Sequence, residues 1–342
     1  MYESYYSFAG MPFQLTPDSR FYFGSQEHRK AMSFLEYGIS QREGFVVITG
    51  EVGAGKTTLV EHLLATIDPQ EYVAARVVTT QLGGYDMLCL IGAGFNLYRE
   101  GMEKSALIAR LMAFFSSLKA QRKHPLVIVD EAQSLTTEAI EELRMLSNLI
   151  MNASAPFQGI FLGQPEFRAA LSHPNMLQFR QRVIASCHLG ALSLEDTRKY
   201  IEYRLRRVGW TDDPRFSDGA FEEIYRRSAG IPRRINSLCS RLLLLGYLEE
   251  SHAIDANSVA SVAEEMSTEV GTMGVLPPHN DLATRVEPAP VRYLEHQSAA
   301  GLSGREVQSR LEKLERLASK HDRALARVLD LALKYLPGDE PK

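Results

Sequence analysis

Cysteine is scarce in this chain of 342 residues, which has three widely separated cysteines, Cys89, Cys187 and Cys239, and no Cys-x-x-Cys pair. Their number and spacing exclude a disulfide framework and a zinc site, so we expect three reduced, buried thiols. No apolar run reaches the ~20 residues of a membrane-spanning helix. The first residues also lack the basic-then-apolar layout of a signal peptide. These absences predict a cytoplasmic protein, attached to a membrane only through a partner.

An excess of one charge sign is also missing. Lys and Arg number 38 against 42 Asp and Glu, which gives a formal net charge of −4. This balance gives no global sign of a protein that binds nucleic acid or a membrane surface, although it is compatible with a local basic patch. The apolar share of 45% is enough to bury a sizeable core, so the length predicts one large or two modest domains.

Strand-like and helix-like segments alternate over residues 1–192. Apolar runs predict five buried strands, at 45–49, 72–80, 126–129, 157–162 and 183–189. Stretches with helical periodicity lie between them. Continuous apolar strands that alternate with helices are typical of a parallel sheet covered on both faces, in a three-layer α/β/α fold.

The rest of the chain divides by composition into three parts. Residues 193–268 contain no convincing strand and predict a small helical domain, in which Ser193 caps the first helix. Residues 269–303 are rich in Gly and Pro and predict a flexible linker. Residues 304–336 predict one long amphipathic helix. Its 4-3 apolar spacing suits a coiled coil, and a single helix packed on its own protein remains the alternative.

A glycine-rich phosphate loop follows the first strand, with the sequence Gly50-Glu51-Val52-Gly53-Ala54-Gly55-Lys56-Thr57 and then Thr58 at the start of a helix. The glycines let backbone N–H groups turn toward a phosphate, and the helix N-terminus favours an anion. In such loops the lysine, here Lys56, bridges the β- and γ-phosphates, and the hydroxyl of Thr57 binds Mg²⁺. The strand–loop–helix context predicts a nucleotide site.

Two acids, Asp130 and Glu131, end the apolar run at 126–129. Ligands of open α/β sheets bind at the carboxyl ends of the strands, so both carboxylates are expected beside the phosphate loop. We expect Asp130 to hold Mg²⁺ and Glu131 to polarise the water that attacks the γ-phosphate. The sequence lacks the Asn-Lys-x-Asp of GTPases and the Leu-Ser-Gly-Gly-Gln of transporter ATPases. It therefore predicts an enzyme that binds ATP and hydrolyses it to ADP and phosphate.

Three further polar positions complete the predicted site. Gln164 follows the fourth strand and can hold the attacking water beside Glu131. Arg233 stands in the first turn of a helix after Gly230 and can reach the γ-phosphate from the helical domain. Arg182, or alternatively Arg180, precedes the fifth strand and can act as an arginine finger in a neighbouring subunit. A finger of that kind predicts a homo-oligomer.

Taken in this order, the motifs resemble those of AAA+ ATPases. The chain more closely resembles the ExeA/GspA type of secretion ATPase, through Pro12-Phe13-Gln14-Leu15-Thr16-Pro17-Asp18, Val129-Asp130-Glu131-Ala132-Gln133, Gly163-Gln164-Pro165-Glu166 and Gly230-Ile231-Pro232-Arg233-Arg234-Ile235-Asn236. Within that type it is most similar to the secretion ATPase of exosortase (XrtA)/PEP-CTERM loci, through Glu142-Leu143-Arg144-Met145-Leu146-Ser147-Asn148 and Val208-Gly209-Trp210. The resemblance covers residues 1–268.

This resemblance implies a sheet order of 5-1-4-3-2 and a helical lid. It also implies that the segment 12–17, with Phe13 and Leu15, and the neighbourhood of His28 line the adenine pocket. The implied partner is an envelope polysaccharide or secretion-locus protein at the inner membrane. Many AAA+ proteins have Asn where this chain has Gln164. Longer GspA proteins carry a membrane segment and a peptidoglycan-binding region, which this sequence does not show, so the resemblance does not imply direct contact with the cell wall.

Two alternatives remain open from the residues. Transposition helper ATPases share this layout and bind DNA. The lid is correspondingly rich in arginine, at positions Arg204, Arg206, Arg207, Arg226, Arg227, Arg233, Arg234 and Arg241. A solvated helix face is the other interpretation of these arginines, and the one we favour. A small-molecule kinase is a weaker alternative.

Overall fold

The computed structural model describes residues 2–16, 18–78, 83–152 and 157–270, all within one unit of the chain. The helix expected at 304–336 and nearly all of the linker expected at 269–303 lie outside these residues. Within the described part, no helix is long and apolar enough to cross a membrane. Cys187 and Cys239 are buried free thiols as expected, whereas Cys89 is only half-buried.

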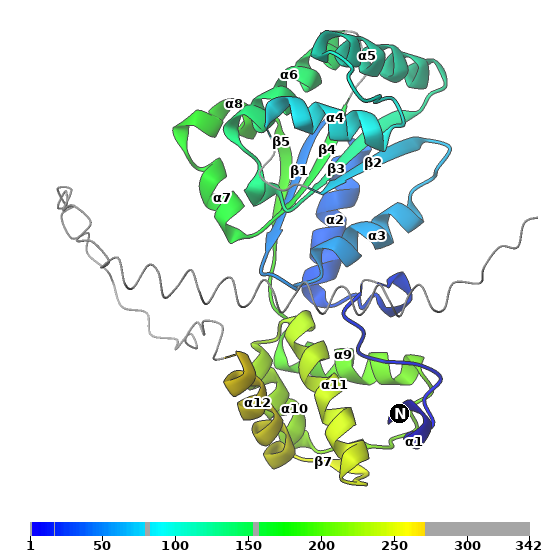
Figure 1. The fold of residues 1–342 in the computed structure, drawn as a ribbon, viewed down its shortest axis with the longest axis vertical. Helices are drawn as coiled ribbons and strands as arrows, with labels where there is room; N and C mark the ends of the chain where they lie inside the picture. The colour runs from blue at the N-terminus through cyan, green and yellow to red at the C-terminus, as the bar shows by residue number, and fades with distance from the viewer. Residues whose placement is uncertain (1, 17, 79–82, 153–156, 271–342) are drawn as a thin grey trace, which may run out of the picture. The chain divides into compact units, whose positions relative to one another are not determined.

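A five-stranded parallel sheet forms the centre of the α/β domain (Figure 1). Its strands are β1 (Gly44–Gly50), β2 (Tyr72–Val78), β3 (His124–Asp130), β4 (Gln158–Gly163) and β5 (Val183–Leu189). Their order in the sheet is β2-β3-β4-β1-β5. Read from the other edge, this is the expected 5-1-4-3-2, so the predicted strands and order are confirmed.

Successive residues of the central strands β1, β3 and β4 bury into two separate cores, which makes the domain three-layered. Val46 and Ile48 of β1 face one core, and Phe45 and Val47 face the other. The first core is covered by α2 (Gln26–Ser40) and α3 (Lys56–Thr66). The second is covered by α4 (Gly84–Gly94), α5 (Lys104–Ala120), α6 (Thr137–Asn152), α7 (Pro165–Leu171) and α8 (Leu177–Arg180).

An aromatic cluster fixes α8 against the sheet. Phe179 stacks on Phe45 at 4.9 Å between ring centroids and meets Phe161 edge-on at 5.0 Å. Pairs of this kind contribute about 0.5–1.5 kcal/mol beyond the burial of their area. The segment that carries Arg180 and Arg182 is therefore held at a defined place on the sheet.

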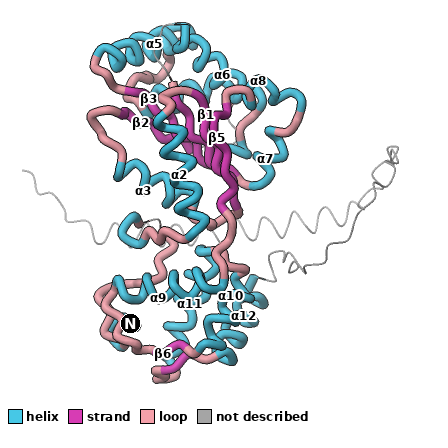
Figure 2. The backbone as a smooth tube through the Cα atoms, turned by 180° about the vertical axis from the view of Figure 1, so that it is seen from behind, coloured by secondary structure: helices cyan, strands magenta, loops and turns pink. Residues whose placement is uncertain are grey.

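The lid consists of α9 (Leu194–Arg207), α10 (Asp218–Ser228), α11 (Pro232–Leu248) and α12 (Ala256–Val270), shown from behind in Figure 2. Ser193 caps α9 as predicted, because its side chain accepts a hydrogen bond from the backbone of Asp196. The expectation of no strand is corrected in one detail. The short strands β6 (Arg215–Phe216) and β7 (Ala253–Ile254) pair in parallel and tie the two helix connections together.

The first residues of the chain pack into the lid, although they precede the α/β domain in sequence. Tyr2, Tyr6, Phe8 and Phe13 are buried in the core formed by α9, α10 and α11, and the Tyr6 hydroxyl donates to the Ser251 carbonyl at 2.9 Å. This segment includes α1 (Tyr2–Tyr5), and the chain then passes through η1 (Ser19–Phe21) to α2. The remaining short helices are η2 (Ala132–Ser134) and η3 (Pro174–Met176).

Candidate nucleotide site

The phosphate loop joins the carboxyl end of β1 to the N-terminus of α3, as its sequence predicts. Lys56 is only 8% exposed, and its ammonium donates to the carbonyls of Gly50 at 2.7 Å and Glu51 at 3.0 Å. Burial lowers the pKa of Lys56, while the nearby carboxylates of Glu131 and Asp130 act in the opposite direction. The charge is thus held inside the loop, where it can meet a phosphate.

Two glycines of the phosphate loop are required, both because of their backbone conformation and because a side chain there would clash. Gly53 and Gly55 have φ values of +83° and +98°, in the left-handed region that side chains disfavour. A Cβ on Gly53 would lie 2.3 Å from the Cβ of Arg233, and one on Gly55 would lie 2.9 Å from Nε2 of His28. The loop is therefore enclosed by the lid on one side and by α2 on the other.

His28, on α2, packs against the phosphate loop. It is 6% exposed, its Nδ1 lies 2.8 Å from the Ser25 hydroxyl, and its ring bonds the backbone of Ala54. The pKa of His28 falls to about 4, chiefly because burial disfavours the charged ring. At neutral pH the imidazole of His28 is therefore uncharged while it bonds the backbone of the loop.

Asp130 lies beside the phosphate loop at the end of β3. Its Oδ2 accepts from the Thr57 hydroxyl at 2.9 Å and from Arg76, on the edge strand β2, at 3.1 Å. Its Oδ1 accepts from the backbone N–H of Glu131 at 3.0 Å. A threonine hydroxyl and an aspartate that meet in this way provide the hard oxygen donors that Mg²⁺ prefers, so these residues fit the predicted metal.

Glu131 is held by two amide side chains. Its Oε2 accepts from Nε2 of Gln133 at 2.5 Å and from Nε2 of Gln164 at 3.2 Å. Gln133 also accepts the backbone N–H of Gln164 at 3.0 Å, which links the ends of β3 and β4. Glu131 itself has φ of 55°, an uncommon conformation for a residue with a side chain. The geometry therefore brings Gln164 to Glu131, as predicted.

The lid contacts the loop through the start of α11. The backbone N–H of Arg233 donates to the carbonyl of Gly53 at 3.1 Å, and its side chain packs over that glycine. Gly230 permits this approach, because its φ is +69° and a Cβ there would lie 2.2 Å from the carbonyl oxygen of Leu192. Arg233 thus lies at the phosphate end of the site.

One cavity runs from the phosphate loop to the first residues of the chain. At the phosphate end it is lined by Val52, Gly53, Gly55, Lys56, Thr57, Thr58, Asp130, Glu131 and Arg233. Its other lining residues are Gln14, Leu15, Thr16, Asp18, Phe21, Tyr22, Phe23, His28, Leu192, Tyr200, Arg204, Pro232 and Asn236. Leu15 and His28 both line this cavity. Phe13, Gly50, Glu51 and Ala54 are not among the lining residues, and Phe13 lies in the lid core.

Arg182 lies at the opposite end of the sheet from the phosphate loop. It precedes β5, whose Val183 pairs with Phe45, whereas Leu189 pairs with Gly50 beside the loop. Six residues of strand separate the two ends by roughly 20 Å. Arg182 is half-buried and donates to Asn148 on α6, whereas Arg180 is exposed. Neither arginine lines this chain's own cavity.

Three contacts of the site were not predicted from the sequence. Gln133 stands two residues after Glu131, and its position beyond the strand end is the only signal that could have pointed to it. Arg76 gave no local signal, because it reaches Asp130 from a neighbouring strand. Tyr200, in the lid, is brought to the cavity by the packing of α9.

The fold and the site define the class: this is an α/β P-loop protein of the AAA+ fold with an AAA domain, which is a nucleotide-binding module. The family described as "AAA domain" matches residues 39–171. The chain is 34% identical over 268 residues to general secretion pathway protein A of Aeromonas hydrophila. That match takes in 78% of this chain and 49% of the relative, so the chain spans about half of the relative's length.

Solved structures show the same fold at low identity. The ORC2 protein of Aeropyrum pernix, in its ADPNP–ADP complexes, is similar with a TM-score of 0.53 and 18% identity, over 70% of this chain and 67% of that one. Cdc6p of Pyrobaculum aerophilum is similar with a TM-score of 0.56 and 13% identity, over 77% and 70%. At these identities the likeness concerns the fold alone.

Proposed function

We propose that this chain binds ATP with Mg²⁺ and hydrolyses it to ADP and phosphate. The observation that carries the proposal is the 2.9 Å bond between Thr57 and Asp130, next to a Glu131 that two amides orient. These are a metal-holding pair and a water-polarising carboxylate at the mouth of a phosphate loop. Lys56 and Arg233 would bind the phosphates from the loop and from the lid.

The substitution Glu131→Gln separates binding from turnover. It keeps the shape of the side chain and removes the charge that polarises water, so phosphate release should fall by about 10²- to 10⁴-fold while ATP still binds. Release of phosphate from Mg-ATP, together with equilibrium binding of ATP, measures both. Turnover by the variant at the wild-type rate would reject the role given to Glu131. Transfer of phosphate to an acceptor, without free phosphate, would favour a kinase.

We propose further that hydrolysis takes place in a homo-oligomer, with Arg182 or Arg180 completing a neighbour's site. The position of both arginines away from their own cavity supports this arrangement. The exposure of Arg180 makes it the more accessible of the two. A Lys56→Ala chain mixed with a chain that lacks the finger should recover part of the activity, because each variant leaves the other's contribution intact. The arginine-finger proposal would be rejected if the two variants stayed inactive when mixed and the wild type were monomeric.

The biological role that we propose is to drive or regulate a cell-envelope assembly, through a partner at the inner membrane. The similarity to general secretion pathway protein A supports a secretion-related role. The sequence resemblance to exosortase-locus ATPases favours a partner in polysaccharide export or protein sorting. The Glu131→Gln form loaded with ATP should retain that partner from native membranes, and Lys56→Ala is the matched control. Equal recovery by both forms would argue against an ATP-dependent partner.

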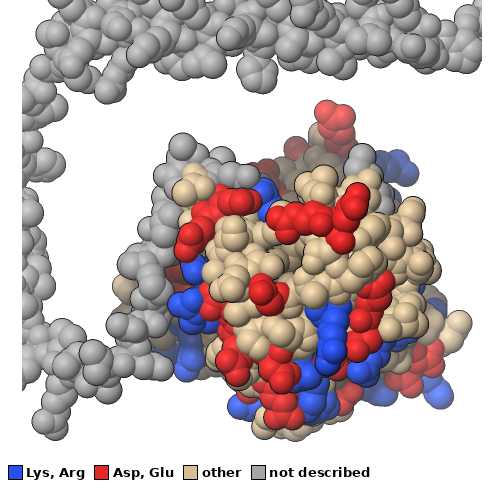
Figure 3. All heavy atoms as spheres, turned by 90° about the horizontal axis from the view of Figure 1, so that it is seen from below, with Lys and Arg blue, Asp and Glu red and all other residues tan. Residues whose placement is uncertain are grey.

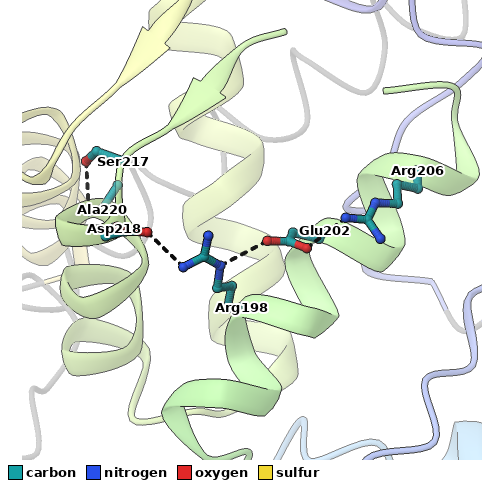
Figure 4. Close-up of polar contacts among 6 residues, drawn as sticks. All are labelled: Arg198, Glu202, Arg206, Ser217, Asp218 and Ala220. Carbon is teal, nitrogen blue, oxygen red and sulfur yellow. Dashed lines mark hydrogen bonds and ion pairs between the residues drawn. The ribbon is translucent and has the colours of Figure 1, made fainter. Parts of the chain in front are cut away.

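The DNA-binding alternative finds less support in the lid. Arg204 is 6% exposed, and Arg206 pairs with Glu202 at 3.0 Å. Glu223 pairs with both Arg226 and Arg227. Figure 4 shows that Arg198 also joins Glu202 to Asp218. On the face drawn in Figure 3, Lys and Arg are interspersed with Asp and Glu.

A further inference from the structure

A buried chain of hydrogen bonds joins the lid to the first residues of the polypeptide. Arg204, on α9, donates through Nε to the carbonyl of Pro12 at 2.6 Å and through Nη1 to the Tyr200 hydroxyl at 2.7 Å. That hydroxyl donates to Oδ1 of Asn236, on α11, at 2.9 Å. Asn236 in turn donates to the carbonyl of Gln14 at 3.3 Å. The lid therefore holds the segment at both ends of Pro12–Gln14.

Arg204 is unusual because its charge is buried without a carboxylate. Among the described residues it makes no ion pair, and Asp18, whose pKa it helps to lower, bonds chiefly to Arg20. Its guanidinium instead lies 4.7 Å from the ring centroid of Phe21. A buried cation that depends on two oxygens and an aromatic face is costly to place, and its position is correspondingly well defined. We call the hydrogen-bonded set of Arg204, Tyr200 and Asn236 the relay.

The held segment continues directly into the wall of the cavity. Gln14, Leu15 and Thr16 line it together with the rings of Phe21 and Tyr22. In this part of the cavity the rings of Phe21, Tyr22 and Phe23 lie among polar side chains such as Gln14 and Asn236. The phosphates of a nucleotide belong at the loop, so its base belongs in this part.

We propose that Arg204, Tyr200 and Asn236 are positioning residues, which keep residues 12–16 in the conformation that receives the nucleobase. This inference rests on the proposed function and adds to it a residue-level basis for base binding. Asn236 stands one helical turn after Arg233, which contacts the phosphate loop, so one helix fixes both ends of the site. Any displacement of α11 would then loosen the phosphate contact and the base wall together.

The substitution Tyr200→Phe tests the relay, because it deletes the hydroxyl that joins Arg204 to Asn236 and keeps the buried ring. If the segment then spends less time in its binding conformation, apparent affinity falls by the same fraction. We expect the Kd for ADP to rise about fivefold, within what the loss of the hydroxyl's two buried hydrogen bonds allows. The Kd for inorganic pyrophosphate, which has no base, should not change. Titration calorimetry of both ligands gives the comparison.

Tyr203→Phe is the matched control on the same helix. Its hydroxyl accepts from Arg207 at 2.9 Å and has no bond to residues 12–14. This variant should bind ADP and pyrophosphate as the wild type does. Asn236→Ala, which removes the other end of the relay, should reproduce the selective loss of ADP affinity and add little to Tyr200→Phe.

Three outcomes would overturn the relay. They are unchanged ADP binding in Tyr200→Phe and Asn236→Ala, an equal loss for ADP and pyrophosphate, and an equal effect of Tyr203→Phe. A wild type that does not bind ADP, or binds it as Lys56→Ala does, would instead reject the proposed function and the relay with it. Thermal unfolding of each variant identifies a loss of folded protein, and Arg204→Lys then provides a variant that keeps the buried charge.

Discussion

The charged side chains of the α/β domain and those of the lid differ in what they pair with. At the sheet edge Lys56, Asp130 and Glu131 line one cavity, where Lys56 and Glu131 bond to neutral groups and Asp130 accepts from both Thr57 and the cation of Arg76. In the lid, surface charges such as Arg206 and Glu202 pair within a helical turn. The first arrangement keeps charge available for a ligand, and the second neutralises it locally. This contrast supports the proposal that the chemistry takes place at the α/β domain, with Arg233 contributed by the lid.

The largest effect that this comparison predicts is at Lys56. Lys56→Ala removes the only cation that is buried within the phosphate loop, so ATP binding should weaken by at least about a hundredfold, as expected for a lost charge-assisted contact. Equilibrium titration with ATP measures it. Arg233→Ala, which removes a cation contributed by the lid, should have a smaller effect. A larger loss of ATP affinity in Arg233→Ala than in Lys56→Ala would place the main phosphate contact in the lid.

A second effect concerns the neutral histidine under the loop. Because the pKa of His28 is depressed to about 4 in the folded protein, protonation favours the unfolded chain. Its contribution is intact above pH 6.5 and is lost as the pH falls toward 4, to a total of about 3 kcal/mol.

Denaturant unfolding of wild type and His28→Gln across this pH range tests the effect. The variant should lose less stability on acidification than the wild type does. His173→Gln, at an exposed histidine, should follow the wild type. Parallel curves for the wild type and His28→Gln would show that His28 has no part in the acid response.

A third and smaller effect tests the contact between the domains. Gly53→Ala puts a Cβ 2.3 Å from the Cβ of Arg233, whereas Gly101→Ala, at a similar φ of +76°, meets no atom within 4 Å. Both variants should lose about 1–2 kcal/mol of stability through backbone strain. Only Gly53→Ala should also lose nucleotide affinity, by about tenfold, because it displaces the start of α11. Equal ADP affinities in the two variants would mean that this contact does not matter for binding.

The smallest effect is expected on the lid surface. Arg206→Ala removes an exposed pair with Glu202 and should change the free energy of unfolding by about 0.3 kcal/mol. In a gel-shift experiment at low salt with ATP, neither the wild type nor this variant should retain duplex DNA. A salt-sensitive shift that Arg206→Ala weakens would instead revive the DNA-binding alternative.

The sequence by itself determined the parts that depend on local pattern. Apolar runs identified all five strands of the sheet. The glycines of the loop at Gly50–Thr57 indicated that its backbone adopts conformations that side chains disfavour. Asp130 and Glu131 followed from the rule that strands deliver their carboxyl ends to one edge. The sheet order came from the resemblance, since periodicity does not specify which strands are neighbours.

Tertiary structure alone decided which distant residues share the site. Arg76 reaches Asp130 from another strand, and Arg204 reaches Pro12 across 192 positions of sequence. The sequence showed Arg204 only as one of many lid arginines, because burial depends on how helices pack and not on local composition. Phe13 was expected at the adenine pocket but lies in the lid core, while its neighbour Leu15 lines the cavity. Side-chain direction in an irregular segment is set by what packs against it.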